Sequence, residues 1–434
     1  MDKMADVLGR AGAWCGQNKY LSAIKNAFQN FMPLTIAGAI GVLWCNVLVN
    51  DQTGLGLFFK PIMALDFLNP AFQAVNFCTI SCITVGITLG IAQEIGIWNM
   101  GAERAGYIPG LVGLAAWLSV TNTSHMVEGA KEAFTGIAGN ELGATGLFTG
   151  MIIGVLSVEL FCFFEKQDAL KIKMPEQVPP GVARAFEVLV PATITLIITA
   201  CIGSACYNLT GLYLNDVIKN GVQGPLGAVG ATVPGVMIIY LVIMLFWLVG
   251  IHGNNMLSAV KEALFTPLAL ENVEAFNKGE TPKNIINMYA LQMWGEFGGS
   301  GVTIGLVIAI MIFGKREDNK AIASLSLVPG LFNINETVTF GIPMVLNPIL
   351  GIPFVVAPLV TIIIGYVLTV IGFCPVACLT VPWTTPPLVF GFLATGANIM
   401  GAVTQAILIV VSTVIYVPFL ISYEKYQNKQ AAEA

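Results

Sequence analysis

Two ionisable residues mark the part of this chain that could do chemistry. Glu336 lies in the largely apolar stretch Ser326–Pro348, and His252 closes a long apolar run that ends near Trp247. A charged side chain in a lipid-like interior costs at least about 2.5 kcal/mol, so a carboxylate there indicates function. Histidine and glutamate can both transfer protons near neutral pH when their surroundings favour it. We therefore take Glu336 as the centre of a candidate site and His252 as its second catalytic candidate.

The stretch around Glu336 interrupts its own apolar run. The interrupting residues are Pro329, Gly330, Asn333, Asn335, Gly341, Pro343, Asn347 and Pro348. In lipid, irregular backbone survives only where it is buried in protein or lines a wet cavity. The stretch is therefore expected to lie inside the protein and to form a site. Two plainer interpretations stay open: backbone amides could satisfy Glu336, and His252 could simply cap a helix.

Aromatic and amide side chains gather in the same interrupted regions. The candidate substrate-binding residues are Trp247, Asn254, Asn255, Trp294, Glu296, Asn333, Asn335 and Trp383. A pyranose has apolar CH faces and polar OH edges, which suit aromatic rings and amide or carboxylate groups. The set favours a polyhydroxylated ligand over an ion alone. Tryptophan is also enriched at membrane interfaces, which is the alternative interpretation for each ring.

The composition places these residues in a membrane protein. Of the 434 residues, 56% are hydrophobic and only 10% are charged, whereas a soluble domain has about 25% charged residues. The net charge of −5 is spread over short loops and leaves no basic face for nucleic acid. The nine cysteines form no CxxC pair, so neither a metal site nor a cofactor is expected.

Hydropathy and charge predict an all-α polytopic protein with both termini in the cytoplasm. Asn18–Asn30 has the pattern of an amphipathic helix lying on the membrane surface. Membrane-spanning segments are expected near 31–50, 74–92, 105–122, 145–164, 186–208, 229–251, 352–374 and 399–422. Lysine and arginine concentrate in the N-terminal segment, in 165–184 and after residue 424, which the positive-inside rule assigns to the cytoplasm.

Charge placement also predicts two re-entrant hairpins. A single crossing at 299–314 would put Lys315 and Arg316 outside, against the positive-inside rule. We expect instead that 284–297 enters the membrane, 298–301 turns and 302–313 returns. A second hairpin is expected over 321–348, with its tip at 332–336. The alternative is another crossing hidden in 256–272, which the charged pair at 261 and 262 makes less attractive.

The predicted elements divide the chain into three parts. These are an N-terminal amphipathic segment (1–30), a transmembrane bundle with its linker (31–228) and a C-terminal part with interrupted helices (229–434). Interrupted helices near the bilayer midplane are the best sequence indication of a transport site.

Several motifs in the third part resemble a known family. They are Pro329–Glu336, Phe340–Pro343, Leu346–Pro348, Gly250–Asn254, Gly298–Gly301 and Pro382–Pro386. As a set they resemble the sugar-transporting IIC component of the bacterial phosphotransferase system, in its lactose/cellobiose/diacetylchitobiose family. The resemblance covers essentially the whole chain. One departure is Thr337, where related sequences commonly have proline.

The resemblance implies a homodimeric permease of the bacterial cytoplasmic membrane. It implies ten membrane helices and two re-entrant hairpins, with dimerisation in the N-terminal half and disaccharide binding in the C-terminal half. A β-linked disaccharide would be carried inward, and its 6-hydroxyl would be phosphorylated by a phosphocysteine on a separate IIB protein, itself supplied by IIA. Glu336 would accept a hydrogen bond from that hydroxyl or act as base, and His252 would orient it or stabilise charge on the phosphoryl group.

Two other classes of function stay open at this point. An ion-coupled secondary sugar transporter would also use interrupted helices and a buried carboxylate. A membrane-embedded hydrolase would need a nucleophile beside a base, and the sequence shows no such arrangement.

Overall fold

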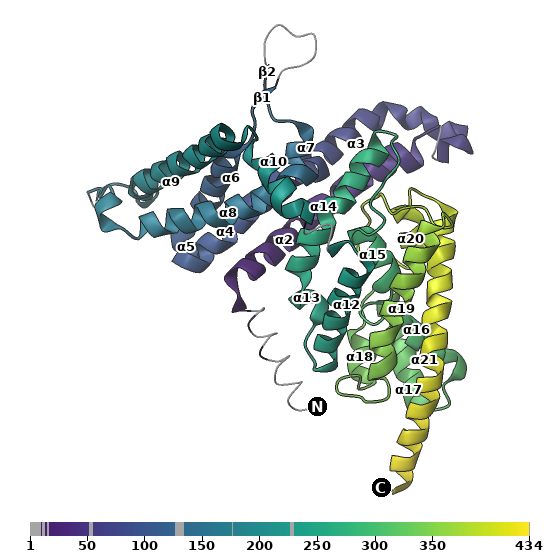
Figure 1. The fold of residues 1–434 in the computed structure, drawn as a ribbon. Helices are drawn as coiled ribbons and strands as arrows, with labels where there is room; N and C mark the ends of the chain where they lie inside the picture. The colour runs from purple at the N-terminus through teal and green to yellow at the C-terminus, as the bar shows by residue number, and fades with distance from the viewer. Residues whose placement is uncertain are drawn as a thin grey trace. The chain divides into compact units, whose positions relative to one another are not determined.

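The computed structural model describes residues 10, 14, 17–51, 55–125, 134–175, 177–225 and 230–433. Over this part of the chain the regular structure is helical, apart from a short antiparallel ribbon of β1 (Ser124–His125) and β2 (Phe134–Thr135) (Figure 1). The predicted all-α class is therefore confirmed. The helices form two compact units, and each has its own packing.

The N-terminal unit comprises the described residues of 17–38 and 75–225. Its helices are the first part of α2 (Lys19–Leu43), α4 (Ile83–Met100), α5 (Ala102–Ala105), α6 (Ile108–Val120), α7 (Gly139–Leu142), α8 (Ala144–Glu165), α9 (Pro180–Thr210) and α10 (Leu214–Ile218). Helices α4, α6 and α8 pack on one another, and α9 packs on α6 and α8. A Cβ added to Gly113 of α6 would lie 2.3 Å from the Ala92 side chain of α4. Small residues of this kind let membrane helices approach closely.

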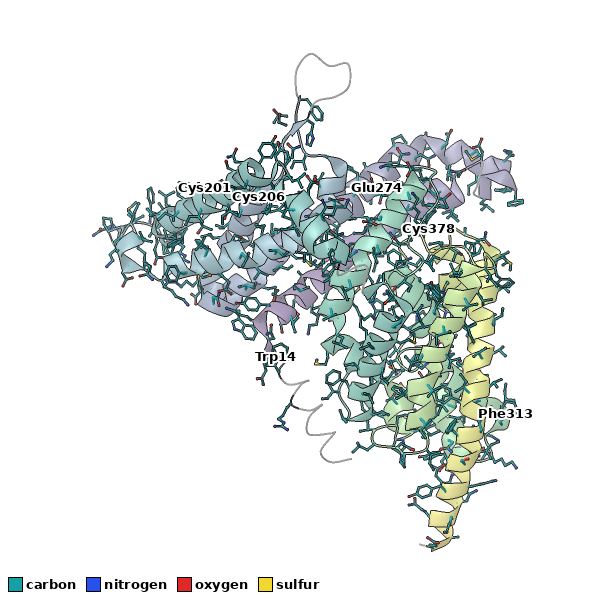
Figure 2. The ribbon with its side chains drawn as sticks, viewed as in Figure 1. Trp14, Cys201, Cys206, Glu274, Phe313 and Cys378 are labelled. Atoms are coloured by element: carbon teal, nitrogen blue, oxygen red, sulfur yellow. The ribbon has the colours of Figure 1, made fainter. Side chains whose placement is uncertain are left out.

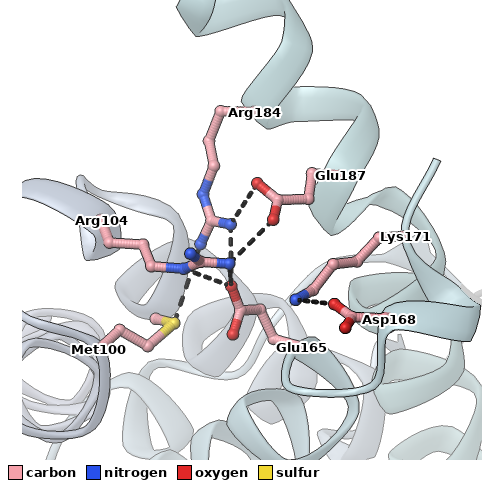
Figure 3. Close-up of polar contacts among 7 residues, drawn as sticks. All are labelled: Met100, Arg104, Glu165, Asp168, Lys171, Arg184 and Glu187. Atoms are coloured by element: carbon pink, nitrogen blue, oxygen red, sulfur yellow. Dashed lines mark hydrogen bonds and ion pairs between the residues drawn. The ribbon is translucent and has the colours of Figure 1, made fainter. Parts of the chain in front are cut away.

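One end of the N-terminal unit holds a cluster of ion pairs, the Glu165 cluster, made of Arg104, Glu165, Arg184 and Glu187 (Figure 3). Oε1 of Glu165 lies 2.8 Å from Arg104 and 2.9 Å from Arg184, and its side chain is only 4% exposed. Glu187 binds the same two arginines at 2.8 and 2.9 Å. The cluster ties the ends of three segments together without leaving a free charge.

An exposed ion pair lies beside this cluster. Lys171 donates to Asp168 at 2.9 Å, and the Asp168 side chain is 81% exposed. The hydrogen bond from Lys171 lowers the pKa of Asp168 below its ordinary value. Figure 3 therefore shows a buried carboxylate, Glu165, and an exposed one, Asp168, each paired with a basic side chain.

The C-terminal unit comprises the described residues of 39–74 and 230–433. Its helices are α12 (Val233–Leu248), α13 (Gly253–Met256), α14 (Ser258–Asn277), α15 (Met288–Gly295), α16 (Ile304–Phe313), α17 (Glu317–Leu331), α18 (Glu336–Gly341), α19 (Gly351–Val370), α20 (Val389–Ala394) and α21 (Ile399–Glu433). Helix α21 packs against α16 and α19, and α19 packs against α12 (Figure 1). The core includes Phe265, Trp294, Phe297, Phe354 and Tyr416.

Two pairs of consecutive helices in this unit are joined by non-helical turns, which we call the first and the second hairpin. The first joins α15 to α16 through 296–303, and the second joins α17 to α18 through 332–335. Val302 at φ 48° and Asn333 at φ 63° hold the left-handed conformation in these turns. Phe313 at the end of α16 and Cys378 in the non-helical segment after α19 lie towards opposite ends of the unit (Figure 2). The turns fall where the sequence predicts them.

The helices support a multi-pass membrane protein but do not confirm the number ten. Among the described residues, five helices are long and apolar enough to cross a membrane. A sixth is obtained when Lys60–Ser81 and Ile83–Met100, bent by 41° at their junction, are counted as one span. Each of the eight segments predicted to cross contains an apolar helix. Two of these helices, α6 and α12, are shorter than the length criterion, and a third, α4, belongs to the bent pair.

Two sequence expectations differ from the structure, and a third point concerns the region 256–272. The first is the boundary at residue 30: α2 runs unbroken from Lys19 to Leu43, with Pro33 inside it, and continues as the π-helix Trp44–Leu48. Proline within an apolar helix bends it without ending it when neighbours satisfy the freed carbonyl. A separate surface helix followed by a new span is therefore not seen. Residues 1–9, which open the predicted 1–30 segment, lie outside the described residues.

The second difference concerns 51–73, which we expected to be a loop. It contains η2 (Leu55–Leu57), the 3-10 helix η3 (Lys60–Leu68) and the start of α3 (Asn69–Asn76), which leads into the π-helix η4 (Phe77–Ser81). Pro61 at the first turn of η3 suits a helix start. Residues 39–74 also group with the C-terminal unit, whereas the sequence assigned them to the N-terminal bundle.

The third point concerns 256–272, where another crossing seemed less attractive: most of this region belongs to the helix α14, which is not among the described helices that are long and apolar enough to cross a membrane. Its 20 residues include Lys261, whose side chain is 7% exposed and paired with Glu296. A buried lysine is tolerated when it is paired. The charge that argued against a crossing here is neutralised by a partner that sequence spacing does not reveal.

Candidate functional site

The tips of the two hairpins are bonded to each other. Asn333 accepts a hydrogen bond from the Gly298 amide at 2.7 Å through Oδ1. Asn335, which is 3% exposed, donates to the Ser300 carbonyl at 2.8 Å. Three of the interrupted motifs predicted from sequence therefore meet at one place, because Asn333 also donates to the carbonyls of Trp383 and Thr385 at 2.5 and 3.0 Å.

His252 and Glu336 face each other beside these tips. His252 is the N-cap of α13, and its Nδ1 accepts the Asn255 amide at 3.2 Å. The neutral ring must therefore carry its proton on Nε2. Nε2 lies 3.7 Å from Oε1 of Glu336, which is longer than a direct hydrogen bond. The cap is therefore seen in the structure, and it leaves Nε2 of the same ring on the side of Glu336, so that a catalytic role for His252 stays a prediction.

Glu336 is the first residue of α18, and its side chain is 48% exposed. A carboxylate at a helix N-terminus is favoured by the helix dipole. The backbone amides of the tip do not enclose it. Oxygen atoms that are both accessible and fixed in position can accept a hydroxyl proton from a ligand.

Trp247 lies under the histidine and not in the open site. Its ring centroid is 4.4 Å from that of His252, it also lies near Phe340 and Phe354, and it is 2% exposed. Trp247 therefore supports the imidazole ring. Trp294 is 1% exposed and packs against Gly365, so the structure makes it a core residue. Trp383 alone of the three is open, at 41% exposed.

Glu296 and Asn254 belong to a second polar group next to the hairpin turn. The hydroxyl of Tyr240 donates to Oε1 of Glu296 at 2.6 Å, and Lys261 forms an ion pair with the same oxygen. Asn254 donates to Oγ of Ser300 at 2.8 Å and accepts from Lys261 at 3.1 Å. Asn255 is exposed and contributes its backbone amide to the His252 cap.

The structure thus brings together His252, Glu336, Asn254, Asn255, Glu296, Asn333, Asn335 and the backbone of Trp383, with Trp247 behind them. It separates Trp294 from them. Sequence reasoning missed Lys261, Tyr240 and Ser300 as members of the site. The one sequence signal for them was a lysine inside a helix that is otherwise largely apolar, which membrane helices carry only with a partner.

The chemistry available is acid–base and hydrogen-bonding chemistry. Over the described residues, no group of three or more histidine, cysteine or acidic side chains gathers as a metal site would require. The site offers a carboxylate, an oriented imidazole N–H, amides and one open indole ring. These groups suit a neutral ligand with several hydroxyl groups.

Apolar helices around a polar site built from interrupted segments define a polytopic membrane transport protein. The family described as "Phosphotransferase system, EIIC" matches residues 25–358, and the chain belongs to this family of sugar permease components. The resemblance seen in the sequence motifs is therefore confirmed.

Individual relatives match over nearly the whole chain. The oligo-beta-mannoside-specific EIIC component of Bacillus subtilis is 33% identical over 429 residues, which cover 98% of this chain and 94% of the relative. The cellobiose-specific EIIC component of Lactococcus lactis is 30% identical and covers 98% of both chains. The crystal structure of ChbC, the IIC component from the N,N'-diacetylchitobiose-specific phosphotransferase system, matches with a TM-score of 0.88, 30% identity and 97% of each chain.

Proposed function

We propose that this chain binds a β-linked disaccharide of the diacetylchitobiose or cellobiose type and carries it across the bacterial cytoplasmic membrane. It then presents the 6-hydroxyl of the sugar for phosphorylation by a phosphorylated IIB protein. The printed names of the relatives support the substrate class, since they concern β-mannosides, cellobiose and diacetylchitobiose. The observation that carries the proposal is the 3.7 Å approach of His252 Nε2 to Glu336 Oε1 at the hairpin tips.

The transfer step needs two groups at one hydroxyl. Oxygen 6 of the sugar attacks the phosphorus of a phosphocysteine on IIB, a P–O bond forms, the P–S bond breaks, and the cysteine leaves as a thiolate. Glu336 accepts the proton of the hydroxyl. The Nε2–H of His252 orients the attacking oxygen or stabilises negative charge on the phosphoryl group. IIA regenerates the phosphorylated IIB protein.

The remaining ligands surround the sugar. Trp383, with 41% of its surface open, stacks on one pyranose face, and the free side chain of Asn255 reaches its hydroxyl groups. Asn333 and Asn335 hold the hairpin tips in register through their bonds to Gly298 and Ser300. Trp247 acts through His252.

The membrane arrangement completes the proposal. Both termini face the cytoplasm, the two hairpins re-enter the membrane, and ten helices cross it. The N-terminal unit forms a homodimer. Leu189, Ile197, Ile202 and Leu209 on α9 are exposed apolar side chains; in a membrane such residues contact lipid or a second copy, which is compatible with this role.

Reconstitution tests the function. Proteoliposomes that contain the purified protein are supplied on the cytoplasmic side with phosphoenolpyruvate and the general components, IIA and IIB. Accumulation of the 6-phosphate of cellobiose or diacetylchitobiose is expected, and it should stop when IIB is left out. Sugar accumulation driven by an imposed ion gradient without a phosphoryl donor would instead establish secondary transport.

Cysteine labelling tests the topology. Single cysteines at Ser300 and Gly330, in a background without native cysteines, should resist a membrane-impermeant reagent added from outside. Ready labelling of both positions without protection by sugar would contradict the two re-entrant hairpins.

A further inference from the structure

Lys261 is a buried cation to which the proposed transfer step gives no role. It lies on the second turn of α14, and its side chain is 7% exposed. Its ammonium group pairs with Oε1 of Glu296, donates to Oδ1 of Asn254 at 3.1 Å and lies 5.5 Å from the centre of the Tyr240 ring. A lysine is rarely buried unless it is paired, so this one must be compensated by its neighbours.

The two carboxylate oxygens of Glu296 are used unequally. In the part of the chain that the structure describes, Tyr240 and Lys261 both bind Oε1, and no hydrogen bond reaches Oε2. The Glu296 side chain keeps 17% of its surface exposed. A carboxylate held through one oxygen presents the other at a fixed place, where a ligand O–H or N–H can donate to it.

The same ammonium group is connected to both catalytic candidates. Asn254, which accepts from Lys261, lies two residues after His252 and donates to Oγ of Ser300 at 2.8 Å. The Ser300 carbonyl accepts from Asn335 at 2.8 Å, and Asn335 precedes Glu336. One continuous series of hydrogen bonds therefore joins α14, the turn that carries the histidine, and both hairpin tips.

We propose that Lys261 is a positioning residue for sugar binding. It neutralises Glu296, fixes that carboxylate so that Oε2 receives a hydroxyl or amide N–H of the sugar, and holds Asn254 against the first hairpin. This role rests on the proposed sugar-binding function. A neutral sugar brings no charge of its own, so a largely buried carboxylate such as Glu296, unlike the exposed Glu336, requires a cation inside the protein when it is a ligand.

Sugar titrations of the purified full-length protein test the role. Cellobiose and diacetylchitobiose are titrated at pH 6 and pH 8 into wild type, Lys261→Met, Glu296→Gln and the double variant, and thermal unfolding is followed for each. Removing one partner of a buried charge pair leaves the other uncompensated, so affinity in Lys261→Met should fall about thirtyfold or more. The ratio of the affinities at pH 6 and pH 8 should also be larger in this variant than in wild type, because protonation neutralises a carboxylate that has lost its cation. Wild type is the reference, since His252, Glu262 and Glu336 belong to the same group of charges in both proteins.

The double variant separates positioning from general damage to the fold. Once Glu296 is replaced by a neutral amide, the lysine has no charge to compensate. Affinity in the double variant should therefore lie within about threefold of Glu296→Gln alone, as expected for strongly coupled neighbours. If Lys261→Met does not fold, this double variant still decides the question.

The same helix offers a matched control. Lys278 and Glu274 form an ion pair of 2.6 Å on α14, with side chains 58% and 41% exposed. Glu274 is labelled in Figure 2. Lys278→Met should bind sugar as wild type does. Wild-type affinity in Lys261→Met, losses that add in the double variant, or the same pH dependence in Lys261→Met as in wild type would each overturn the positioning role while the proposed function stands. Failure of wild type to bind either sugar would overturn both.

Discussion

Glu165 in the N-terminal unit and Glu336 in the C-terminal unit are opposite kinds of carboxylate. Glu165 is 4% exposed and bound by two arginines at 2.8 and 2.9 Å (Figure 3). Glu336 keeps 48% of its side chain exposed. Among the described residues its ion-pair neighbour is His252, at 3.7 Å, which is positively charged only when protonated. A carboxylate whose hydrogen-bonding capacity is used by arginines is suited to hold helices together. A carboxylate whose oxygen atoms remain accessible beside an imidazole is suited to bind a ligand.

The backbone conformations of the two units also differ, and the difference parallels that between the two carboxylates. In the described residues, the non-glycine residues with positive φ are Val302, Asn333, Leu346, Leu388 and Ala397, and all of them belong to the C-terminal unit. A β-branched residue such as Val302 strongly disfavours that conformation. Such strain persists only where the surroundings enforce it, and it gathers at functional sites. The N-terminal unit reserves positive φ for glycine, as a supporting scaffold would.

The largest effect is expected from Glu336→Gln. The two side chains are nearly isosteric, so the protein should fold, but the amide cannot accept the hydroxyl proton. Loss of a general base should slow phosphorylation by about 10²–10⁴-fold. The rate of sugar 6-phosphate formation with the complete relay measures it. A well-folded variant with full phosphorylation would remove the base role and, with it, the contrast between the two carboxylates.

Glu165→Gln should produce the reverse pattern. Its amide cannot hold two guanidinium groups, and Arg184 is only 18% exposed, so unfolding in mixed micelles should become easier by about 2–3 kcal/mol. Sugar affinity of the folded fraction should not change. Asp168→Asn, at the exposed pair in the same view, is the control and should leave the unfolding transition where it is in wild type. A loss of sugar affinity in folded Glu165→Gln, or a loss of phosphorylation rate as large as that in Glu336→Gln, would contradict this division between the two carboxylates.

His252 should show an intermediate effect, because one ring serves two purposes. His252→Asn keeps a side chain able to cap α13 but removes the Nε2–H. Affinity should fall about tenfold and phosphorylation about 10²-fold. Calorimetric titration and the phosphorylation assay measure the two losses on the same preparation. Unchanged affinity and unchanged turnover would leave His252 with capping alone.

Sequence reasoning located this site because its signal is local. The apolar run is interrupted by Pro329, Gly330, Asn333 and Asn335, and three of the four residues in the turn 298–301 are glycines. Both patterns can be recognised within a short stretch of sequence. The turns at 298–301 and 332–336 and the place of Glu336 followed from such short patterns, whereas the two re-entrant hairpins were predicted from charge placement. The family followed from the same motifs taken together.

What sequence reasoning could not supply depends on distant partners. The Lys261–Glu296 pair joins residues that are 35 positions apart, so the sequence showed the charge of Lys261 but not the partner that compensates it. Trp247, Trp294 and Trp383 look alike in sequence, yet two are buried and one is open, because the packing of other helices decides which face of a ring is covered. The boundary expected at residue 30 came from the amphipathic pattern of Asn18–Asn30, which does not show that the helix continues to Leu43.

The smallest effect we expect concerns Trp383, and it tests whether the open ring belongs to the site. Trp383 is 41% exposed, and its carbonyl accepts from Asn333 at the hairpin tip. If the ring stacks on a pyranose, Trp383→Ala should lose about 1–3 kcal/mol of sugar affinity, by analogy with stacking on other planar ligands. Trp383→Phe should retain part of this affinity.

The matched control is Trp98 of α4, in the N-terminal unit, which is 57% exposed. Trp98 does not belong to the proposed sugar site, so Trp98→Ala should bind sugar as wild type does in the same titration. Equal losses at Trp98 and Trp383 would mean that the sugar does not bind in the C-terminal unit alone, and the contrast between a scaffold unit and a binding unit would have to be abandoned.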